Sequence, residues 1–355
     1  NEHEERRSYR ICPLCEACCG LEVKTRGEQV IGIRGALDDV FSAGYICPKG
    51  YALKDLHEDP DRLRRPLLKR DGRFVEVGWD EAFAEIERRL LPIVERDGRD
   101  AVAVSVGNPS AHKMSLLLYF GRLAKALGTK NVFSASTLDQ MPKQLSCGLV
   151  FGHWLSFPIP DIVRTQWLLV IGANPVASNG SLWTVPDFRG KAKALRARGG
   201  KLIVIDPRRT ETAELADLHL AVRPGADAFL LGALLAVLAR RDAVDHAFLA
   251  AHTEGYDEVR AALLAVPVDD WLAAADISRA DIERTADMIA SAKAMVVRVE
   301  LGIQQGVNST LNSWLEKLLI LLTGSLGRPG TNQIHSWLAP LWGNSQGKVY
   351  APTGD

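Results

Sequence analysis

Five of the six cysteines precede position 50, and this crowding constrains the fold of the chain more than any other feature of its sequence. Cys12, Cys15, Cys18, Cys19 and Cys47 occur in two stretches, "ICPLCEACCG" and "YICPKG". Disulfide bonds are disfavoured, because the thiols are packed into one short segment of a large chain that has no secretory signal. The sequence predicts instead a small, loop-rich N-terminal domain built around a metal site.

The spacing of the thiols indicates which metal they bind. Cys12-x2-Cys15-x3-Cys19-x27-Cys47 places three thiols in one loop and a distant fourth before a proline. A zinc ribbon normally has two close Cys-x2-Cys pairs, whereas this three-plus-one arrangement is more typical of a 4Fe–4S cluster. Zinc stays the alternative, and a ligand set with Cys18 in place of Cys19 fits the bare chemistry nearly as well.

Hydrophobic periodicity predicts an α/β fold for the rest of the chain. Residues 21–35 alternate in polarity around a turn at 26–28, which predicts a β-hairpin beside the thiol loops. From about residue 100, short apolar strands alternate with helices, as in the βαβ units of a parallel sheet. The predicted organisation is a small iron–sulfur β domain over 1–65, followed by Rossmann-like parallel-sheet domains over 66–135, which 325–355 is expected to complete, and over 136–324.

The bulk composition excludes several classes of partner. Lys plus Arg and Asp plus Glu are both 43, so the chain carries no net charge that favours nucleic acid or an acidic membrane surface. The most apolar stretches, 230–239 and 315–324, are too short to span a bilayer, so no transmembrane segment is expected. Without a secretory signal the protein is expected to be cytoplasmic; export by a twin-arginine leader that has been removed is the alternative.

Polar loops follow four of the predicted strands: "GNP" (107–109), "GAN" (172–174), "DPRR" (206–209) and "GIQQG" (302–306). Ligands of open parallel sheets bind beyond the carboxyl ends of the strands. Four such loops predict an extended nucleotide-type ligand, although ordinary turn chemistry explains any one of them. The sequence contains no GxGxxG or Walker A pattern, which disfavours a standard NAD or ATP loop.

These motifs together resemble the molybdopterin oxidoreductase superfamily of formate dehydrogenases, periplasmic-type nitrate reductases and dimethyl sulfoxide reductases. The resemblance rests on the cysteine motif with its Cys-Pro-Lys-Gly ending and, in the same order as in the family, on "GANP", "IDPRRTET", "RPGAD" and "GRPG". It covers nearly the whole chain. It implies that a 4Fe–4S cluster is held by Cys12, Cys15, Cys19 and Cys47, with Cys18 as a spare thiol.

The resemblance also implies a molybdenum or tungsten centre carried by two molybdopterin guanine dinucleotides. Asp206 matches the guanosine-binding carboxylate of the family, with Arg208 or Arg209 nearby. Asp227 resembles a second nucleotide contact, for which a helix N-cap is an equal alternative. Lys49 matches the lysine between cluster and pterin, although a solvated surface lysine is the alternative. The other cofactor-binding residues expected at the strand ends are Asn108, Asn174, Asn179 and Gln304.

The metal ligand implied by the resemblance is Asp139. The formate dehydrogenase pattern is Cys-His-x-Pro followed by Phe-Gly, and Pro142 and residues 151–152 match its later part. The ligand position then falls on Asp139, and Gln140 takes the place of the active-site histidine. A carboxylate suits an oxidised, high-valent metal. Cys147 as ligand and a metal without a protein ligand are the alternatives, and the missing Cys-His pair puts formate chemistry in doubt.

The expected function is a two-electron redox reaction or oxygen-atom transfer on a small-molecule substrate, with electrons leaving through the cluster to a partner subunit. The alternative is an electron-transfer subunit without molybdenum, as in the related subunit of respiratory NADH dehydrogenase. A zinc-bearing nucleotide-binding protein is a third alternative. Family catalytic subunits continue with a C-terminal barrel domain, so the chain is expected to be a fragment or to be completed by a second polypeptide.

Overall fold

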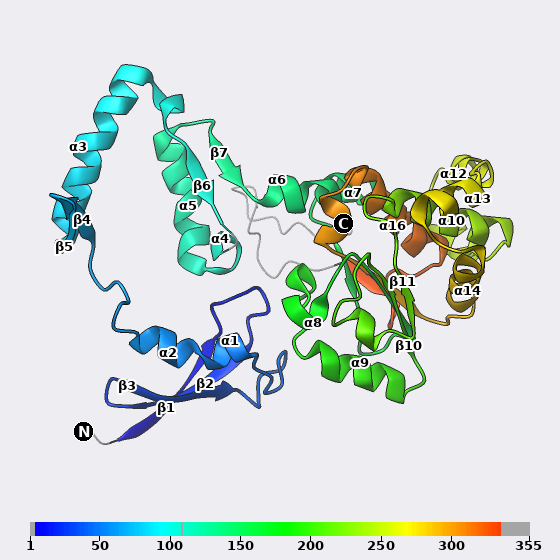
Figure 1. The fold of residues 1–355 in the computed structure, drawn as a ribbon, viewed down its shortest axis with the longest axis horizontal. Helices are drawn as coiled ribbons and strands as arrows, with labels where there is room; N and C mark the ends of the chain where they lie inside the picture. Colours follow the sequence, from blue (N-terminus) through cyan, green and yellow to red (C-terminus); the bar gives the residue numbers. More distant parts are fainter. Residues whose placement is uncertain (1–3, 108, 335–355) are drawn as a thin grey trace. The chain divides into compact units, whose positions relative to one another are not determined.

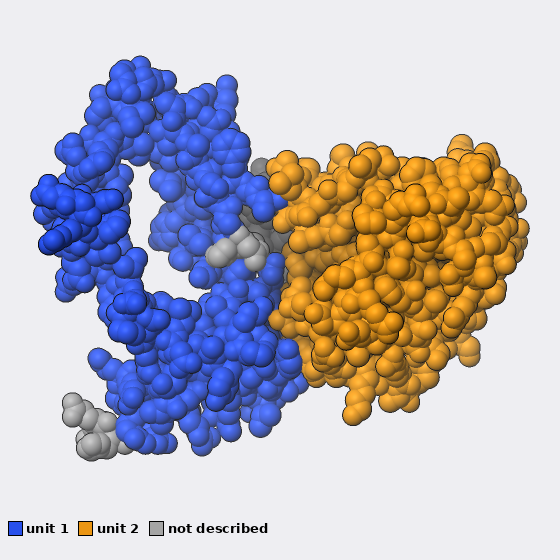
Figure 2. Space-filling model, viewed as in Figure 1, with its two compact units in different colours: residues 1–135 blue, residues 136–355 orange. Residues whose placement is uncertain are grey.

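The computed structural model describes residues 4–107 and 109–334. The chain divides into two compact units, residues 1–135 and 136–355 (Figure 2). A small antiparallel sheet comes first and parallel sheets follow, which confirms the predicted α/β class. The predicted division into three domains stays a prediction, because only residues 325–334 of the segment expected to complete 66–135 are described.

The first unit opens with an antiparallel sheet of order β1-β2-β3. Its strands are β1 (Glu5–Ile11), β2 (Gly20–Arg26) and β3 (Gln29–Gly35). Strands β2 and β3 are joined at Gly27 and Glu28, and Gly27 has a φ of 57°, a left-handed conformation that glycine adopts without strain. The hairpin predicted from residues 21–35 is therefore present, and two short helices follow it, α1 (Pro48–Tyr51) and α2 (Leu53–Glu58).

The remainder of the first unit contains a β-hairpin and one parallel βαβ unit. Strands β6 and β7 pair in parallel, whereas the predicted strand over 101–107 is longer than β6. The strand starts late because Asp100 is held by the chain near β7: its carboxylate accepts from the N–H of Lys130 at 2.8 Å and its carbonyl from the Asn131 amide at 2.7 Å. The elements are β4 (Leu67–Arg70), β5 (Arg73–Glu76), α3 (Trp79–Asp97), β6 (Val104–Val106), α4 (Pro109–His112), α5 (Met114–Leu127) and β7 (Val132–Ser134).

The second unit is built on a parallel sheet of order β11-β10-β9-β12. The strands are β9 (Trp167–Ile171), β10 (Lys201–Ile205), β11 (Leu218–Leu220) and β12 (Met295–Val299). Both faces of the sheet are buried, so the strands are apolar at nearly every position. Leu168 and Val170 pack toward α9 (Phe188–Ala197), and Leu169 and Ile171 pack toward α10 (Asp227–Arg240). The two helices lie on opposite sides of the sheet (Figure 1).

Helix α10 is apolar almost all round because other helices enclose it. It packs against α12, α13, α14 and α16, which together form the larger hydrophobic core. In the described part of the chain, no helix has the length and apolar character needed to cross a membrane. The remaining elements of this unit are α6 (Ser136–Asp139), α7 (Met141–Phe151), β8 (Pro158–Pro160), α8 (Pro175–Ser178), α11 (His246–His252), α12 (Tyr256–Leu264), α13 (Val268–Ala275), α14 (Arg279–Ala290), α15 (Leu301–Gln304), α16 (Ser309–Leu322) and β13 (Asn332–Ile334).

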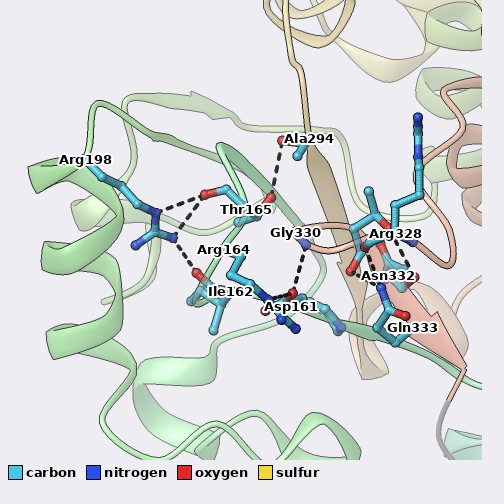
Figure 3. A network of polar contacts seen from close by, with 12 residues as sticks. Asp161, Ile162, Arg164, Thr165, Arg198, Ala294, Arg328, Gly330, Asn332 and Gln333 are labelled. Carbon is cyan, nitrogen blue, oxygen red and sulfur yellow. Dashed lines mark hydrogen bonds and ion pairs between the residues drawn. The ribbon is translucent and has the colours of Figure 1, made fainter.

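A polar network ties the loops at the amino ends of the strands together (Figure 3). The Arg198 guanidinium donates to the carbonyl oxygens of Ile162 and Thr165, and the Asp161 carboxylate accepts from the N–H of Gly330 at 2.8 Å. Nearby, the amide of Asn332 exchanges two 2.9 Å hydrogen bonds with the backbone of Val297 in the edge strand β12. These contacts fix the amino end of the sheet and leave the carboxyl end to the loops that carry the candidate site.

The strand order creates a topological switch point beside β9. From β9 the chain proceeds through β10 and β11 on one side, and β12 is added on the other side. The loops after β9 and β12 lie at this point of the carboxyl edge, which is where open α/β sheets place the crevice that binds nucleotide-type ligands.

Candidate cluster and cofactor sites

The first candidate site is the loop that connects β1 and β2. It is closed at its base by the N–H of Cys12, which donates to the carbonyl of Cys19 at 2.8 Å. Both residues are buried at the ends of their strands, and Cys15 lies half-buried between them. Cys47 stands directly before α1, which packs against β3. The small sheet thus supports the thiol loop and the distant fourth thiol together.

The electrostatic surroundings of each thiol show which cysteines lie together. Burial, together with smaller effects of the neighbouring Cys12, Cys15 and Cys47, raises the pKa of the Cys19 thiol to about 11. Burial also raises the pKa of Cys18, where the other contributors are Cys15, Cys12 and Glu16. In the described residues Cys47 therefore acts on Cys19 and not on Cys18. The structure brings together the four thiols of the predicted ligand set.

Cys18 is set apart by its backbone as well. Its φ is 47°, a left-handed backbone conformation that residues with a side chain rarely adopt. Its thiol is directed to the carbonyl of Cys15, with 3.8 Å between Sγ and the oxygen. In residues 4–107 and 109–334, no three His, Cys, Asp or Glu side chains converge closely enough for one metal ion. The choice of a 4Fe–4S cluster over zinc therefore rests on the spacing of the cysteines.

Lys49 lies beside the thiol loop. It is exposed on α1, and its charge lowers the pKa of Cys12 against the larger opposing effect of burial. The buried Gly50 lets the backbone of α1 approach the loop: a Cβ atom at this position would lie 2.9 Å from Ile46 Cγ1 and 3.7 Å from Cys12 Sγ. The predicted position of Lys49 near the cluster agrees with this packing, and its role in electron transfer stays a prediction.

The second candidate site lies at the carboxyl edge of the sheet in the second unit. Here the loops after β9 and β12 touch backbone to backbone, because Gly172 and Gly302 face each other. The N–H of Gly302 donates to the carbonyl of Gly172 at 3.0 Å. The predicted polar loop 302–306 is in part a helix, since α15 covers Leu301–Gln304. This close approach fixes the loops after β9 and β12 to each other at the switch point.

A Gly302→Ala substitution is expected to destabilise the second unit. The added Cβ atom would lie 2.7 Å from the Cα atom of Gly172, and both partners are backbone, so the loops must separate. We expect a loss of about 1–3 kcal/mol in the free energy of unfolding, measured by denaturant titration. Gly306→Ala is the matched control, because within the described residues no atom lies within 4 Å of the place its methyl group would take. Equal stability of the two variants would contradict the proposed contact.

Asn174 joins the loops that follow β9 and β10. Its amide oxygen accepts from the Thr212 hydroxyl at 2.7 Å, and its amide nitrogen donates to the Glu211 carboxylate at 2.8 Å. Asn179 lies farther along the same loop, where it caps α8 in a left-handed conformation with a φ of 54°. Asparagine tolerates this conformation, so Asn179 has a structural role in addition to the predicted contact with a cofactor.

Asp206 and Asp227 lie at the carboxyl edge of the sheet, where Asp206 acts electrostatically on Asp227. Asp206 is half-buried after β10, and its carboxylate accepts from the N–H of Arg208 at 2.8 Å. Asp227 is the buried first residue of α10. Burial raises the pKa of its carboxyl, a backbone hydrogen bond opposes this shift, and the Asp206 carboxylate raises the pKa further. The Arg208 side chain is exposed and lies 3.5 Å from Glu211.

Asp139, Gln140 and Gln304 gather on the β12 side of the crevice. Asp139 ends α6 and Gln140 is the N-cap residue of α7, and α15 packs against both helices. The Gln304 amide donates to the Ser313 hydroxyl at 2.6 Å. The amide oxygens of Gln140 and Gln304 are buried without a hydrogen-bond partner among the described residues. Both can therefore accept hydrogen bonds from a ligand.

Two kinds of predicted residue are not placed in this crevice. Asn108 lies outside the described residues. Lys49 and the thiol loop belong to the first unit, so their positions relative to the crevice are not defined.

Sequence reasoning missed three buried charges beside the crevice: Lys143, Arg298 and Glu300. Arg298 lies in β12 and Glu300 directly follows it, and two charges at the end of a strand buried on both faces are unusual. Lys143 shares the buried face of α7 with Ser146 and Cys147. The charged positions in an otherwise apolar strand were the signal available in the sequence.

The fit of these residues to a cofactor can be tested on the structure itself. Among the described residues, amide oxygens without partners lie beside the switch point and two carboxylates lie farther along the same edge of the sheet. Pterin and guanine rings carry several N–H donors. The residues present therefore fit a pterin guanine dinucleotide. An iron–sulfur module followed by a parallel-sheet unit with such a crevice defines a class of redox proteins that bind an extended nucleotide-type cofactor.

The chain belongs to the molybdopterin oxidoreductase family: residues 62–347 match the molybdopterin oxidoreductase model, and residues 7–58 match the molybdopterin oxidoreductase Fe4S4 domain. These matches confirm the resemblance drawn from the motifs. They also confirm the two predicted cofactor classes, molybdopterin and a 4Fe–4S cluster.

Several curated proteins are similar to this chain. It is 29% identical over 326 residues to the F420-dependent formate dehydrogenase 2 subunit alpha of Methanococcus maripaludis, covering 91% of this chain and 46% of that protein. It is 28% identical to formate dehydrogenase H of Escherichia coli, covering 94% and 46%, and 29% identical to the assimilatory nitrate reductase catalytic subunit of Bacillus subtilis, covering 90% and 44%. The chain thus spans about half the length of these relatives.

Among solved structures, acetylene hydratase from Pelobacter acetylenicus has the same fold. The TM-score is 0.77 at 24% sequence identity, and the match covers 94% of this chain and 46% of that one. At this identity the likeness supports the fold and carries no information on the reaction.

Proposed function

We propose that this chain is the cofactor-binding part of an oxidoreductase with a molybdenum or tungsten bis(pterin guanine dinucleotide) centre, which passes electrons through the N-terminal 4Fe–4S cluster. The observation that carries the proposal is the grouping of Asp139, Gln140 and Gln304 where α6 and α7 pack on α15, with Asp206 and Asp227 following β10 and β11 along the same carboxyl edge of the sheet. The names of its relatives, formate dehydrogenase and nitrate reductase, are those of redox enzymes.

Each residue of the crevice has a role in holding the cofactor. The Asp206 and Asp227 carboxylates accept hydrogen bonds from the guanine N–H groups. The buried amide oxygens of Gln140 and Gln304 accept from N–H groups of the pterin. When bound, the metal centre supplies the two-electron chemistry, and the protein supplies binding, orientation and electrostatics.

Asp139 is the proposed protein ligand of the metal. A carboxylate suits a high-valent metal, and Asp139 lies half-buried at the crevice. The alternative ligand, Cys147, is fully buried, on the face of α7 opposite to the exposed Leu145. Burial raises the pKa of the Cys147 thiol to about 11, against a smaller lowering by Lys317, so it is protonated near neutral pH. This chemistry favours Asp139 over Cys147.

The Asp139–Gln140 pair favours oxygen-atom transfer over formate oxidation. Gln140 is uncharged at every working pH and cannot act as the proton acceptor that a histidine provides. Its amide orients a bound ligand by hydrogen bonding instead. A small-molecule substrate and an electron-accepting partner subunit complete the proposal.

Metal analysis of the purified protein tests this function. We expect about four iron atoms per chain and about one molybdenum or tungsten. Iron without molybdenum or tungsten, after expression with both metals supplied, would overturn the main proposal and favour the electron-transfer subunit. Zinc without iron would contradict both. Extraction and chromatography of the released guanine nucleotide give an independent count of the pterin cofactor.

A further inference from the structure

The helix that follows the candidate metal ligand has its polar and apolar faces reversed. Helix α7 buries Lys143, Ser146 and Cys147 and exposes Leu145 and Leu149. Hydrophobic burial normally sets the rotation of a helix about its own axis. The buried face of α7 contains Pro142 and Cys147 as well as polar side chains, and Lys143, in the first turn, makes polar contacts to the end of β12.

Lys143 connects α7 to the end of β12. Its ammonium donates to the carbonyl of Val299 and to Glu300 Oε1, both at 3.2 Å, and it lies 5.9 Å from the centre of the Phe157 ring. The side chain is only 3% exposed. The Lys143 side chain is held in one position, because its ammonium is removed from water and depends on these two acceptors for its hydrogen bonds.

We call the contact between Lys143 and Glu300 the anchor, and Glu300 also pairs with a second buried cation. The same oxygen that pairs with Lys143 also pairs with Arg298, whose guanidinium donates to the carbonyl of Gly180 at 3.0 Å. Burial would raise the pKa of Glu300, but Arg298, Lys143 and a hydrogen bond from Ser181 outweigh it and hold the pKa below its usual range. One carboxylate oxygen therefore joins α7, β12 and the loop after β9.

The surroundings of the anchor carry further charges. Glu316 and Lys317 on α16 are buried, lie 3.1 Å apart and act electrostatically on Lys143. Burial lowers the pKa of Lys143, Glu300 raises it, and Arg298 and Lys317 lower it again. Removing one partner of such a set leaves a buried charge without compensation. The set is therefore sensitive to single substitutions.

We propose that Lys143 and Glu300 are positioning residues that fix the turn carrying Asp139 and Gln140 against α15 at the crevice. Lys143 stands one helical turn beyond Asp139, so its anchor determines where that carboxylate and the Gln140 amide lie. The hydrogen bonds of a charged pair are directional and hold α7 in one position. A leucine in place of Lys143 would let α7 slide along its neighbours. The inference rests on the proposed function for the role of Asp139 at the metal.

The test compares Lys143→Met, Glu300→Gln and the conservative Lys143→Arg in the protein as isolated. Lys201→Met is the matched control, because Lys201 is half-exposed and lies 3.3 Å from Asp217 on the surface. We expect K143M and E300Q to alter the EPR signal of the molybdenum or tungsten centre, with iron unchanged at about four per chain. K143R and K201M keep the parent signal. A parent EPR signal in K143M and E300Q would overturn the proposal.

Hydrogen exchange on the same variants separates this inference from the proposed function. Amides of residues 136–151 are expected to exchange about 10-fold faster in K143M and E300Q than in the parent and K201M, since local opening becomes easier. If the parent holds no molybdenum or tungsten, the proposed function fails while this result still supports the anchor. Unchanged exchange overturns the anchor whatever the metal content. E300Q keeps the shape of the side chain and decides the question should K143M not fold.

Discussion

A Cys19→Ser variant is expected to lose the visible absorbance of the iron–sulfur cluster, whereas a Cys18→Ser variant keeps it. Cys19 is buried at the end of the thiol loop, before β2, and shares its surroundings with Cys12, Cys15 and Cys47. A serine oxygen binds iron poorly at a thiolate position, and the other three thiols cannot close the site alone. The iron content should fall from about four per chain to near zero in the first variant.

Cys18→Ser is the matched control, since it makes the same chemical change one residue away. The Cys18 thiol is directed to the Cys15 carbonyl, and its left-handed backbone is tolerated no worse by serine. Retained absorbance in Cys19→Ser together with bleaching in Cys18→Ser would assign the ligand set to Cys12, Cys15, Cys18 and Cys47 instead. Anaerobic purification is required, so that loss of the cluster reports the ligand and not oxidation.

An Asp139→Ala variant is expected to change the spectrum of the metal centre and to lower turnover by about 10–100-fold or more. The expectation follows from the place of Asp139 at the end of α6, against α15 at the crevice. Turnover is measured with nitrate and with formate, the substrates that give the similar relatives their names. The iron–sulfur absorbance should stay unchanged, because the cluster thiols lie in the other unit.

Two controls make this result specific. Asp257→Ala removes an exposed carboxylate from α12, and Cys147→Ala removes the alternative ligand. Both are expected to retain the parent spectrum of the metal centre. A changed spectrum in Cys147→Ala, with Asp139→Ala unaffected, would move the ligand assignment to the thiol on α7.

The elements of the fold that are encoded locally were predictable. The hairpin over 21–35 follows from alternation around Gly27, and the parallel sheet follows from short apolar runs separated by helices. The short helix at 301–304 was not predictable, because Gly302 is a residue typical of turns. Its helical form depends on the tertiary contact between Gly172 and Gly302, which no local pattern records.

Candidate site residues could be predicted from the sequence where they follow a strand. Contacts between charged residues far apart in the sequence could not. Asp206 and Asp227 could be named from their positions at element ends, and Asp206 acts electrostatically on Asp227. The pair of Lys143 and Glu300 is separated by 157 positions, and each residue alone is an ordinary surface type. Their pairing arises from the packing of α7 on the end of β12, so only the three-dimensional structure reveals it.

The strand order also fixes when the crevice can exist during synthesis. Strand β9 can pair with β10 as soon as residues 201–205 have been made, but its other edge waits for β12, whose Met295 pairs with Trp167. Pairings between residues so far apart in sequence form late and slowly. Until then the loop of Gly172 lacks its contact with Gly302, and the turn bearing Asp139 has nothing to anchor on. The half of the proposed site that bears Asp206 and Asp227 is thus translated before β12, whereas the half that holds Asp139 and Gln304 against α15 is completed only afterwards.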